Sequence, residues 1–352
     1  DLHSFPTRRS SDLVGVSETH GKAAMISNDL GGKGLVDYRY SAACGRNASE
    51  ITGKCICFIT EDLVDRLRRL FDYEKNELVM SDIPGFGVGA LEHVYLKLDK
   101  EYHGEFQMAP FVVVAEPATL DLLVPGRPDP NLPAEMVVLL DAQLKEADLI
   151  ILNKCDTLSL QEQERYLAWL KTSYPDRGVL GISAAIGENV DAVIQYLLTH
   201  DARLENVEFG YEQQQFDQAF GKLSEYNSQF YTKVCCFDFD ANAYLEDLTC
   251  AISDRLRRVD RTTPHLKVFG QTGDGQVCMV NLTGVDRPVK IEQTISHRCV
   301  DLPVVINTTS ACEPDRLEQL IQDAIDTVSR QYNLSVFMFY TECFGLMDEG
   351  RI

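Results

Sequence analysis

The stretch ILNKCD places Asn153, Lys154 and Asp156 directly after an apolar run. This spacing suits guanine. The Asp156 carboxylate can accept hydrogen bonds from the N1–H and the exocyclic amine, Asn153 can contact the other edge of the base, and the Lys154 stem can lie over the ring. Adenine presents the wrong donor and acceptor pattern to a carboxylate, so such a site would reject it. An ordinary surface turn after a strand is the alternative interpretation of these residues.

A second stretch favours the guanine interpretation. ISAAIGEN follows the next predicted strand and places Ser183 and Ala184 where guanine-nucleotide proteins have a second base-contacting loop. Ligands of open α/β sheets bind beyond the carboxyl ends of the strands. We therefore expect Asn153, Lys154, Asp156, Ser183 and Ala184 to form one nucleotide-binding site.

The stretch VMSDIPGFG places Asp82 and Gly85 after another predicted strand. A carboxylate there can hold a water of Mg²⁺, and a glycine amide can approach a γ-phosphate because no Cβ intervenes. A Pro-Gly turn without function is the alternative. With the guanine motif downstream, we assign Asp82 and Gly85 to catalysis.

The stretch EITGKCICF contains a Cys-x-Cys pair, Cys55 and Cys57, preceded by Glu50. Two thiolates can bind one soft metal ion, but Zn²⁺ usually takes four ligands, so Glu50, Cys44 or a histidine elsewhere would have to contribute. The alternative is that both cysteines are small buried residues. The predicted metal ligands are Cys55, Cys57 and Glu50.

The phosphate-binding motif that such a protein needs, G-x-x-x-x-G-K-[ST], has no match in the sequence. The nearest candidate, GVSETHGKAA, has five residues between Gly15 and Gly21, and Ala23 replaces the Ser or Thr. It also leads into a predicted strand, whereas a phosphate loop opens a helix. We therefore reject it.

The elements that must position these residues alternate between strand and helix. Apolar periodicity predicts strands at 23–27, 77–81, 110–116, 148–153 and 178–183, and helices at 61–71, 91–102, 135–147, 161–174 and 188–200. Such alternation predicts an α/β fold with a doubly wound, mostly parallel sheet. Together with the guanine motif, this sheet resembles that of the P-loop GTPases.

A polar, Gln-rich connector separates this domain from a second one. We place the GTPase domain at 14–205, a helical connector at 206–231 and a C-terminal domain at 232–352. The second domain is predicted to contain strands at 233–239, 265–271, 276–283, 300–307 and 335–340 and helices at 243–259 and 313–333. The order β-α-β-β-(β)-α-β predicts a small ferredoxin-like α+β domain.

Composition restricts the function further. The net charge of −21 disfavours binding to nucleic acid or to an anionic membrane. The sequence contains no apolar run of about 18 residues and no secretory signal near its start. The 11 cysteines are scattered and odd in number, which favours reduced thiols and a cytoplasmic location.

Residues 14–352 resemble the CobW/HypB/UreG-type metal-chaperone GTPases, in particular the CobW-like branch. The resemblance rests on ISNDLGGKGLVD, which contains Asn28, Asp29 and Asp37, and on EITGKCICF, DIPGFG, LNKCD and SAA. The metal-transferring members usually carry Gly-Gly-Cys-x-Cys-Cys. Here the glycine pair is Gly53-Lys54 and Phe58 replaces the third cysteine, which removes one thiolate from the usual zinc or cobalt site.

The resemblance implies GTP hydrolysis with Mg²⁺, coupled to metal delivery or to the maturation of a client metalloenzyme, with Zn²⁺ or Co²⁺ as the metal. It also implies that Asp29 contributes to nucleotide binding and that the protein can form a homodimer. In this scheme the γ-phosphate and Mg²⁺ would order the loops around 29–57 and 82–87. If the Cys pair lies on such a loop, nucleotide state and metal affinity would be linked.

Two other functions remain open. One is a nucleotide-independent interaction protein whose Cys pair is structural. The other is a GTPase that supports the activation of a corrinoid- or metal-dependent enzyme without carrying metal itself, which the missing third cysteine suggests. Metal analysis of the purified protein separates the second alternative from a metallochaperone.

Residues 1–13, DLHSFPTRRSSDL, are expected to be a non-native, adapter-like segment fused to the gene at about Val14. They would occupy the place of the first strand, the phosphate loop and most of the first helix. On this interpretation the chain as written binds GTP weakly and hydrolyses it negligibly. Micromolar GTP affinity measured by calorimetry would contradict that expectation.

Overall fold

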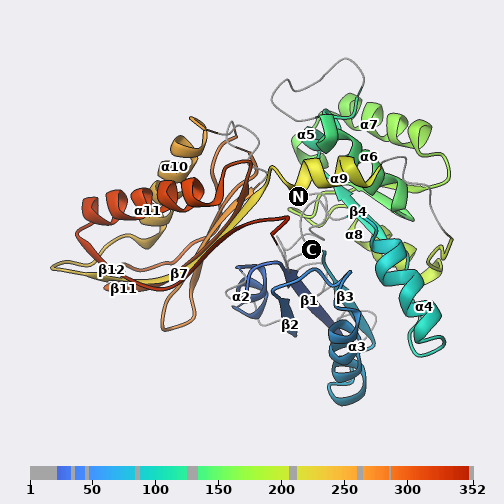
Figure 1. Cartoon of the computed structure of the whole chain (residues 1–352), viewed down its shortest axis with the longest axis horizontal. Coiled ribbons are helices and arrows are strands. Elements are labelled where there is room, and N and C mark those ends of the chain that lie inside the picture. The colour runs from blue at the N-terminus through green and yellow to red at the C-terminus, as the bar shows by residue number, and fades with distance from the viewer. Residues whose placement is uncertain are drawn as a thin grey trace. The chain divides into compact units, whose positions relative to one another are not determined.

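A computed structural model describes residues 22–32, 36–43, 47–83, 88–124, 134–205, 212–259, 265–284 and 287–348 (Figure 1). The chain divides into two compact units. The first contains residues 1–28 and 47–216, and the second contains residues 29–46 and 217–352. A short segment near the N-terminus therefore belongs to the same unit as the C-terminal third of the chain.

The first unit contains two parallel three-stranded sheets among the described residues. Their orders are β2-β1-β3 and β4-β5-β6, and β1 pairs in parallel with β3, as β5 does with β4 and β6. The strands are β1 (Ala23–Asp29), β2 (Ala48–Thr52), β3 (Leu78–Ser81), β4 (Val112–Ala115), β5 (Leu149–Leu152) and β6 (Gly178–Gly181).

Helices alternate with these strands along the chain. They are α3 (Thr60–Arg68), the π-helical η1 (Arg69–Tyr73) and η2 (Leu91–Leu96), α4 (Lys97–Glu101), α5 (Pro117–Leu120), α6 (Ala134–Glu146), the 3-10 turn η3 (Cys155–Thr157), α7 (Leu160–Ser173), α8 (Val190–Thr199) and α9 (Gln213–Phe220). The predicted α/β class is confirmed. The parallel strands form two hydrogen-bonded groups, however, and no ladder joins these groups within the described residues.

Burial explains why the central strand β5 can be predicted from the sequence. All four residues of β5 are buried, as expected for a strand covered on both faces. Helix α7 begins with a complete capping box: the Ser159 hydroxyl accepts from the Glu162 N–H, and the Glu162 carboxylate accepts from the Ser159 N–H. The helix is therefore fixed at its start, close to the predicted residue 161.

The second unit is built on a six-stranded antiparallel sheet of order β10-β9-β8-β11-β7-β12. Its elements are α2 (Val36–Ala43), β7 (Ser224–Val234), α10 (Ala241–Leu256), β8 (His265–Gln271), β9 (Val277–Leu282), β10 (Lys290–Gln293), β11 (Asp301–Ser310), α11 (Pro314–Gln331) and β12 (Leu334–Gly345). Strands β12-β7-β11-β8 have the order of a ferredoxin-like fold, and β9 and β10 extend it at one edge.

The two faces of this sheet are covered by different elements. Val268, Val280 and Ile306 belong to the core formed with α10 and α11, which lie over one face (Figure 1). Their sequence neighbours Phe269 and Met279 pack instead with α2. Because successive side chains of a strand point to opposite faces, the apolar runs of β8, β9 and β11 supply both cores.

Strand β7 corrects one predicted boundary. It begins at Ser224, inside the range assigned to the connector, and ends at Val234, before most of the predicted strand at 233–239. Its first half is polar yet buried, including Glu225, Asn227 and Ser228. A buried polar strand lacks the apolar alternation by which strands are recognised, which explains the error.

Candidate functional site

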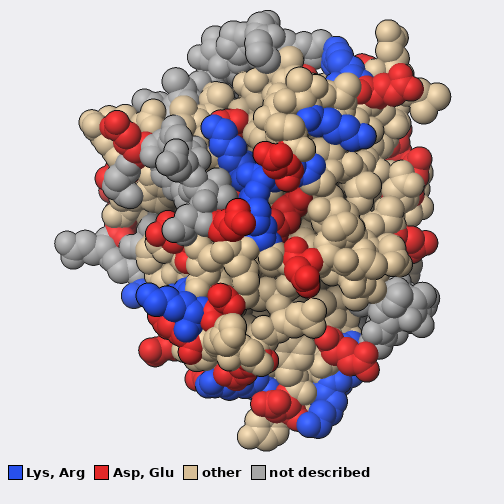
Figure 2. All heavy atoms as spheres, turned by 90° about the vertical axis from the view of Figure 1, so that its right-hand side faces the viewer, with Lys and Arg blue, Asp and Glu red and all other residues tan. Residues whose placement is uncertain are grey.

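The predicted guanine-binding residues follow neighbouring parallel strands. Ala115 of β4 pairs with Leu152 of β5, which pairs with Gly181 of β6. The residues that come next in the chain therefore emerge at one edge of this sheet, the edge at which α/β sheets bind ligands. Figure 2 shows one face of the molecule, on which acidic and basic side chains are interspersed.

Asn153 connects the two predicted base-contacting loops. It is buried, and its Oδ1 accepts hydrogen bonds from the backbone N–H of Lys154 at 2.7 Å and of Ala184 at 3.1 Å. These two bonds engage the amide oxygen, so the Nδ2 group is the part of the side chain that can donate to a base. The structure thus brings Asn153, Lys154 and Ala184 together as predicted.

Asp156 is held by the second loop. The Ser183 hydroxyl, which is fully buried, donates to Asp156 Oδ1 at 2.5 Å. The backbone supports this arrangement, because the Cys155 N–H donates to the Ile182 carbonyl at 3.0 Å. Asp156 is itself exposed. The Ser183 hydroxyl therefore orients its carboxylate, which remains accessible from solvent.

Lys154 is fixed at both ends. Its backbone adopts a left-handed conformation with φ of 65°, which is uncommon for a residue with a side chain. Its ammonium group forms an ion pair with Glu116, which directly follows β4 and is buried. The aliphatic stem of Lys154 is therefore stretched along the edge of the sheet between two fixed points.

A second group of predicted residues meets around Asn28, at the end of β1. The Asn28 backbone N–H donates to Asp82 Oδ1 at 2.7 Å. Its side chain donates to the carbonyls of Ile51 at 3.2 Å and Lys54 at 2.9 Å, and it accepts from the Ile56 N–H at 2.8 Å. The buried Asn28 side chain thus links the Cys-x-Cys loop to β1, and the Asn28 backbone N–H orients Asp82.

Cys55 and Cys57 lie together in this loop and are only 8% and 7% exposed. The Cys57 thiol donates to the Cys55 sulfur, which lowers the pKa of Cys55 and raises that of Cys57. The Cys57 backbone N–H also donates to Cys55 Sγ at 3.4 Å. The two cysteines therefore form one buried, hydrogen-bonded pair.

The predicted third metal ligand does not join this pair. Within the described ranges, no group of three or more His, Cys, Asp or Glu side chains is placed to hold a metal ion. Glu50 lies on β2 next to the buried Ile51, and adjacent strand residues point to opposite faces. The set of Cys55, Cys57 and Glu50 is therefore corrected to two thiols.

Glu146, at the end of α6, is a charged residue that the sequence did not single out. It is 1% exposed, and its carboxylate accepts hydrogen bonds from the N–H of Gly89 and, at 3.3 Å, of Leu91 at the start of η2. Loss of solvation outweighs these bonds and raises the pKa of Glu146 to about 7. Its charge also contributes to the raised pKa of Cys57.

One predicted nucleotide-binding residue is placed differently. Asp29 belongs to the second compact unit, where its carboxyl group hydrogen-bonds with Glu225 and accepts from the Gly31 N–H at 3.1 Å. Burial raises the pKa of both carboxyl groups. Gly85, the rejected motif at Gly15 and Gly21, and the adapter-like segment 1–13 lie outside the described residues.

Sequence reasoning missed two residues that organise the site. Glu116 follows β4 in the same way that Asn153 follows β5, and this position was its only signal. Asn28 appeared within a motif, but nothing in the sequence showed that its side chain serves three backbone groups.

Comparisons with known proteins bear on this arrangement. The family model described as CobW/HypB/UreG, nucleotide-binding domain, matches residues 12–180. Hydrogenase maturation factor HypB from Archaeoglobus fulgidus is similar at 15% identity over 53% of this chain and 79% of that chain, with a TM-score of 0.31. Zn(II)-bound YjiA GTPase from E. coli is similar at 11% identity over 88% of this chain and 91% of that chain, also with a TM-score of 0.31.

The matched region contains most of the described site. Asn28, Asp82, Cys55, Cys57 and Asn153 all lie within residues 12–180, whereas Ser183 and Ala184 follow directly after it. Among the described helices, none is both long and apolar enough to cross a membrane. Residues 12–180 of this chain therefore match the nucleotide-binding domain of the CobW/HypB/UreG family.

Proposed function

We propose that this protein binds guanine nucleotides and acts as a GTP-hydrolysing factor in metal delivery to, or maturation of, a client metalloenzyme. The single observation that carries the proposal is that two side-chain hydrogen bonds join the Asn153–Asp156 turn to the Ser183–Ala184 loop. The family of residues 12–180 supports nucleotide binding, and the resemblance of the motifs supports the metal-related role.

Base recognition follows from the orientation of Asp156. Its carboxylate accepts from guanine N1–H and from the exocyclic 2-amino group, two donors that adenine does not present in this position. The hydrogen bond from Ser183 sets the carboxylate angle before the base arrives. Asn153 Nδ2 donates to the opposite edge of the base, and the fixed stem of Lys154 covers one face of the ring.

The phosphate side is assigned to Asp82. The N–H of Asn28 orients this carboxylate, and carboxylate oxygens and their bound waters are the ligands that Mg²⁺ prefers. Bound Mg²⁺ supplies neutralisation of phosphate charge. The role of this chain in that step is to hold the Asp82 carboxylate at a fixed angle at the end of β3.

A GTPase that supports a metalloenzyme without carrying the metal is the second candidate. The observation in its favour is that Cys55 and Cys57 hydrogen-bond to each other and are almost fully buried. Metal analysis of the purified protein and of its Cys57→Ser variant distinguishes the two. Stoichiometric metal that is lost in the variant supports the metal-carrying form.

The central proposal is tested by ligand-detected NMR, which also registers weak binding. Saturation transfer from the protein to GDP should exceed transfer to ADP, and Ser183→Ala should reduce the difference because Asp156 loses its orienting donor. Asp176→Asn is the matched control, since this exposed residue lies outside the site. Equal transfer to both nucleotides in the unmodified protein would refute the proposed guanine site.

A further inference from the structure

The boundary between the two compact units falls on a single peptide bond near the end of β1. Asn28 belongs to the first unit and Asp29 to the second. The segment 29–46 that follows, described over 29–32 and 36–43, is thus part of the unit that contains the C-terminal sheet. Two consecutive residues therefore belong to two different compact units.

On the first side of this bond, Asn28 is bound to the phosphate-side residues. Its N–H donates to Asp82 Oδ1, and its side chain accepts from Ile56 in the Cys-x-Cys loop. A change in the position of Asp82 therefore acts directly on the backbone of Asn28.

On the second side, Asp29 is bound to strand β7. Its carboxyl group hydrogen-bonds with Glu225, which in turn accepts from Asn227 Nδ2 at 2.7 Å. The chain then passes so close to this strand that a Cβ on Gly31 would lie 2.2 Å from Asn227 Nδ2. Only glycine fits there without displacement of the Asn227 side chain.

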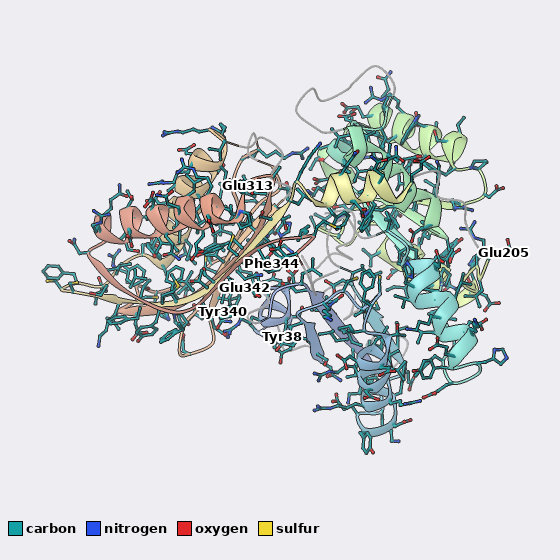
Figure 3. All side chains as sticks on the ribbon, viewed as in Figure 1. Tyr38, Glu205, Glu313, Tyr340, Glu342 and Phe344 are labelled. Carbon is teal, nitrogen blue, oxygen red and sulfur yellow. The ribbon has the colours of Figure 1, made fainter. Side chains whose placement is uncertain are left out.

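The next contact reaches strand β12. The Gly32 N–H donates to Glu342 Oε2 at 2.8 Å, and Tyr340 donates to the same carboxylate. Figure 3 labels Tyr340 and Glu342 on β12 and Tyr38 on α2. Asp29, Gly31 and Gly32 thus hold adjacent strands β7 and β12.

Helix α2 completes the attachment with charge and apolar packing. Lys267 of β8 donates to Asp37 Oδ2 at 2.6 Å, and Arg39 donates to Gln229 of β7 at 3.0 Å. Val36 and Tyr40 pack in the core on this face of the sheet. The segment is therefore fixed to the sheet along its described length.

We propose that the segment 29–43 transmits the position of Asp82 to the C-terminal sheet through the Asn28–Asp29 peptide bond. The C-terminal domain is then the element that responds to the ligand state of the phosphate side. This inference rests on the proposed function only for the identity of the ligand at Asp82. The coupling itself is a property of the chain and is reciprocal: whatever displaces Asp82 loosens the segment, and whatever loosens the segment displaces Asp82.

The test measures residue-resolved amide hydrogen exchange by NMR on the full chain without added nucleotide. Asp82→Ala should accelerate exchange of the Gly32 amide by about fivefold or more, the low end of ordinary coupling between sites. In the reverse direction, Gly31→Ala should accelerate exchange of the Asn28 and Ile56 amides. Gly273→Ala is the control, because a Cβ at Gly273 meets open space.

Either direction suffices if one variant fails to fold. Acceleration confined to the unit that carries the substitution, with amides of the other unit within twofold of the unmodified protein, overturns the inference. The GDP and ADP comparison above is independent of this measurement, so a failure of the guanine site and a failure of the coupling are distinguishable.

Discussion

The buried carboxyl group of Glu146 gives a quantitative prediction for the stability of the first unit. Its pKa is raised from an ordinary 4.5 to about 7 by loss of solvation. Between these values the unfolded chain has released the Glu146 proton while the folded chain still holds it. Unfolding therefore releases a proton in this window, and the free energy of unfolding falls as pH rises. The contribution is fully present below about pH 4.5 and is lost as pH passes through about 7.

The magnitude follows from the shift. Each pKa unit corresponds to about 1.4 kcal/mol, so a rise from 4.5 to about 7 corresponds to roughly 3 kcal/mol of unfolding free energy. Glu146→Gln keeps one acceptor oxygen for the N–H groups of Gly89 and Leu91 but cannot titrate. The difference between the unfolding free energies of the two proteins should therefore change by about 3 kcal/mol between pH 4.5 and pH 8.

The assay uses urea unfolding followed by fluorescence of Trp169, the single tryptophan of the chain. Trp169 lies in α7, and Glu146 ends α6 of the same unit. The fluorescence signal therefore reports unfolding of the unit that contains Glu146. Glu164→Gln is the matched control, because Glu164 is an exposed glutamate of the same unit and is not among the groups that shift the pKa of Glu146. Parallel curves for the unmodified protein and Glu146→Gln across this pH range would refute the desolvation argument.

Two further substitutions test the local structure of the first unit with the same fluorescence signal. Asn28→Ala removes three side-chain hydrogen bonds from a buried position and should lower the unfolding free energy by about 3 kcal/mol, at about 1 kcal/mol for each bond; a loss below about 1 kcal/mol would show that Asn28 does not hold the loop. Ser159→Ala removes the hydroxyl of the α7 capping box and should cost about 1 kcal/mol, whereas Thr172→Ala at the exposed end of the same helix should cost less. Equal costs for the two would contradict the capping assignment.

The sequence predicted the α/β order because β5 and its neighbour β4 are short, largely buried and apolar. It also predicted that the Asn153–Asp156 turn and the Ser183–Ala184 loop lie together, since the two motifs follow strands that are adjacent in a parallel sheet. It did not predict β7, whose buried residues Glu225, Asn227 and Ser228 are polar. A polar residue is recognised as buried only when its partner is known, and Asp29 and Asn307, which bind Glu225 and Asn227, lie far away along the chain.

The same limit applies to the attachment of α2. Val36 and Tyr40 are too few to define an apolar stripe, and their partners lie more than 200 residues later. The metal ligand set failed for a different reason. Sequence spacing placed Glu50 near Cys55 and Cys57 but did not fix the face of β2 on which its carboxylate lies.

The most direct test of the central claim changes the base that Asp156 recognises. Xanthine has a carbonyl oxygen where guanine has the 2-amino group, so the Asn side chain in Asp156→Asn can donate where the native carboxylate accepted. The account predicts that saturation transfer in the unmodified protein favours GDP over xanthosine diphosphate, and that Asp156→Asn reverses this order. An Asp156→Asn variant that still prefers GDP over xanthosine diphosphate would contradict the assignment of Asp156 to guanine recognition.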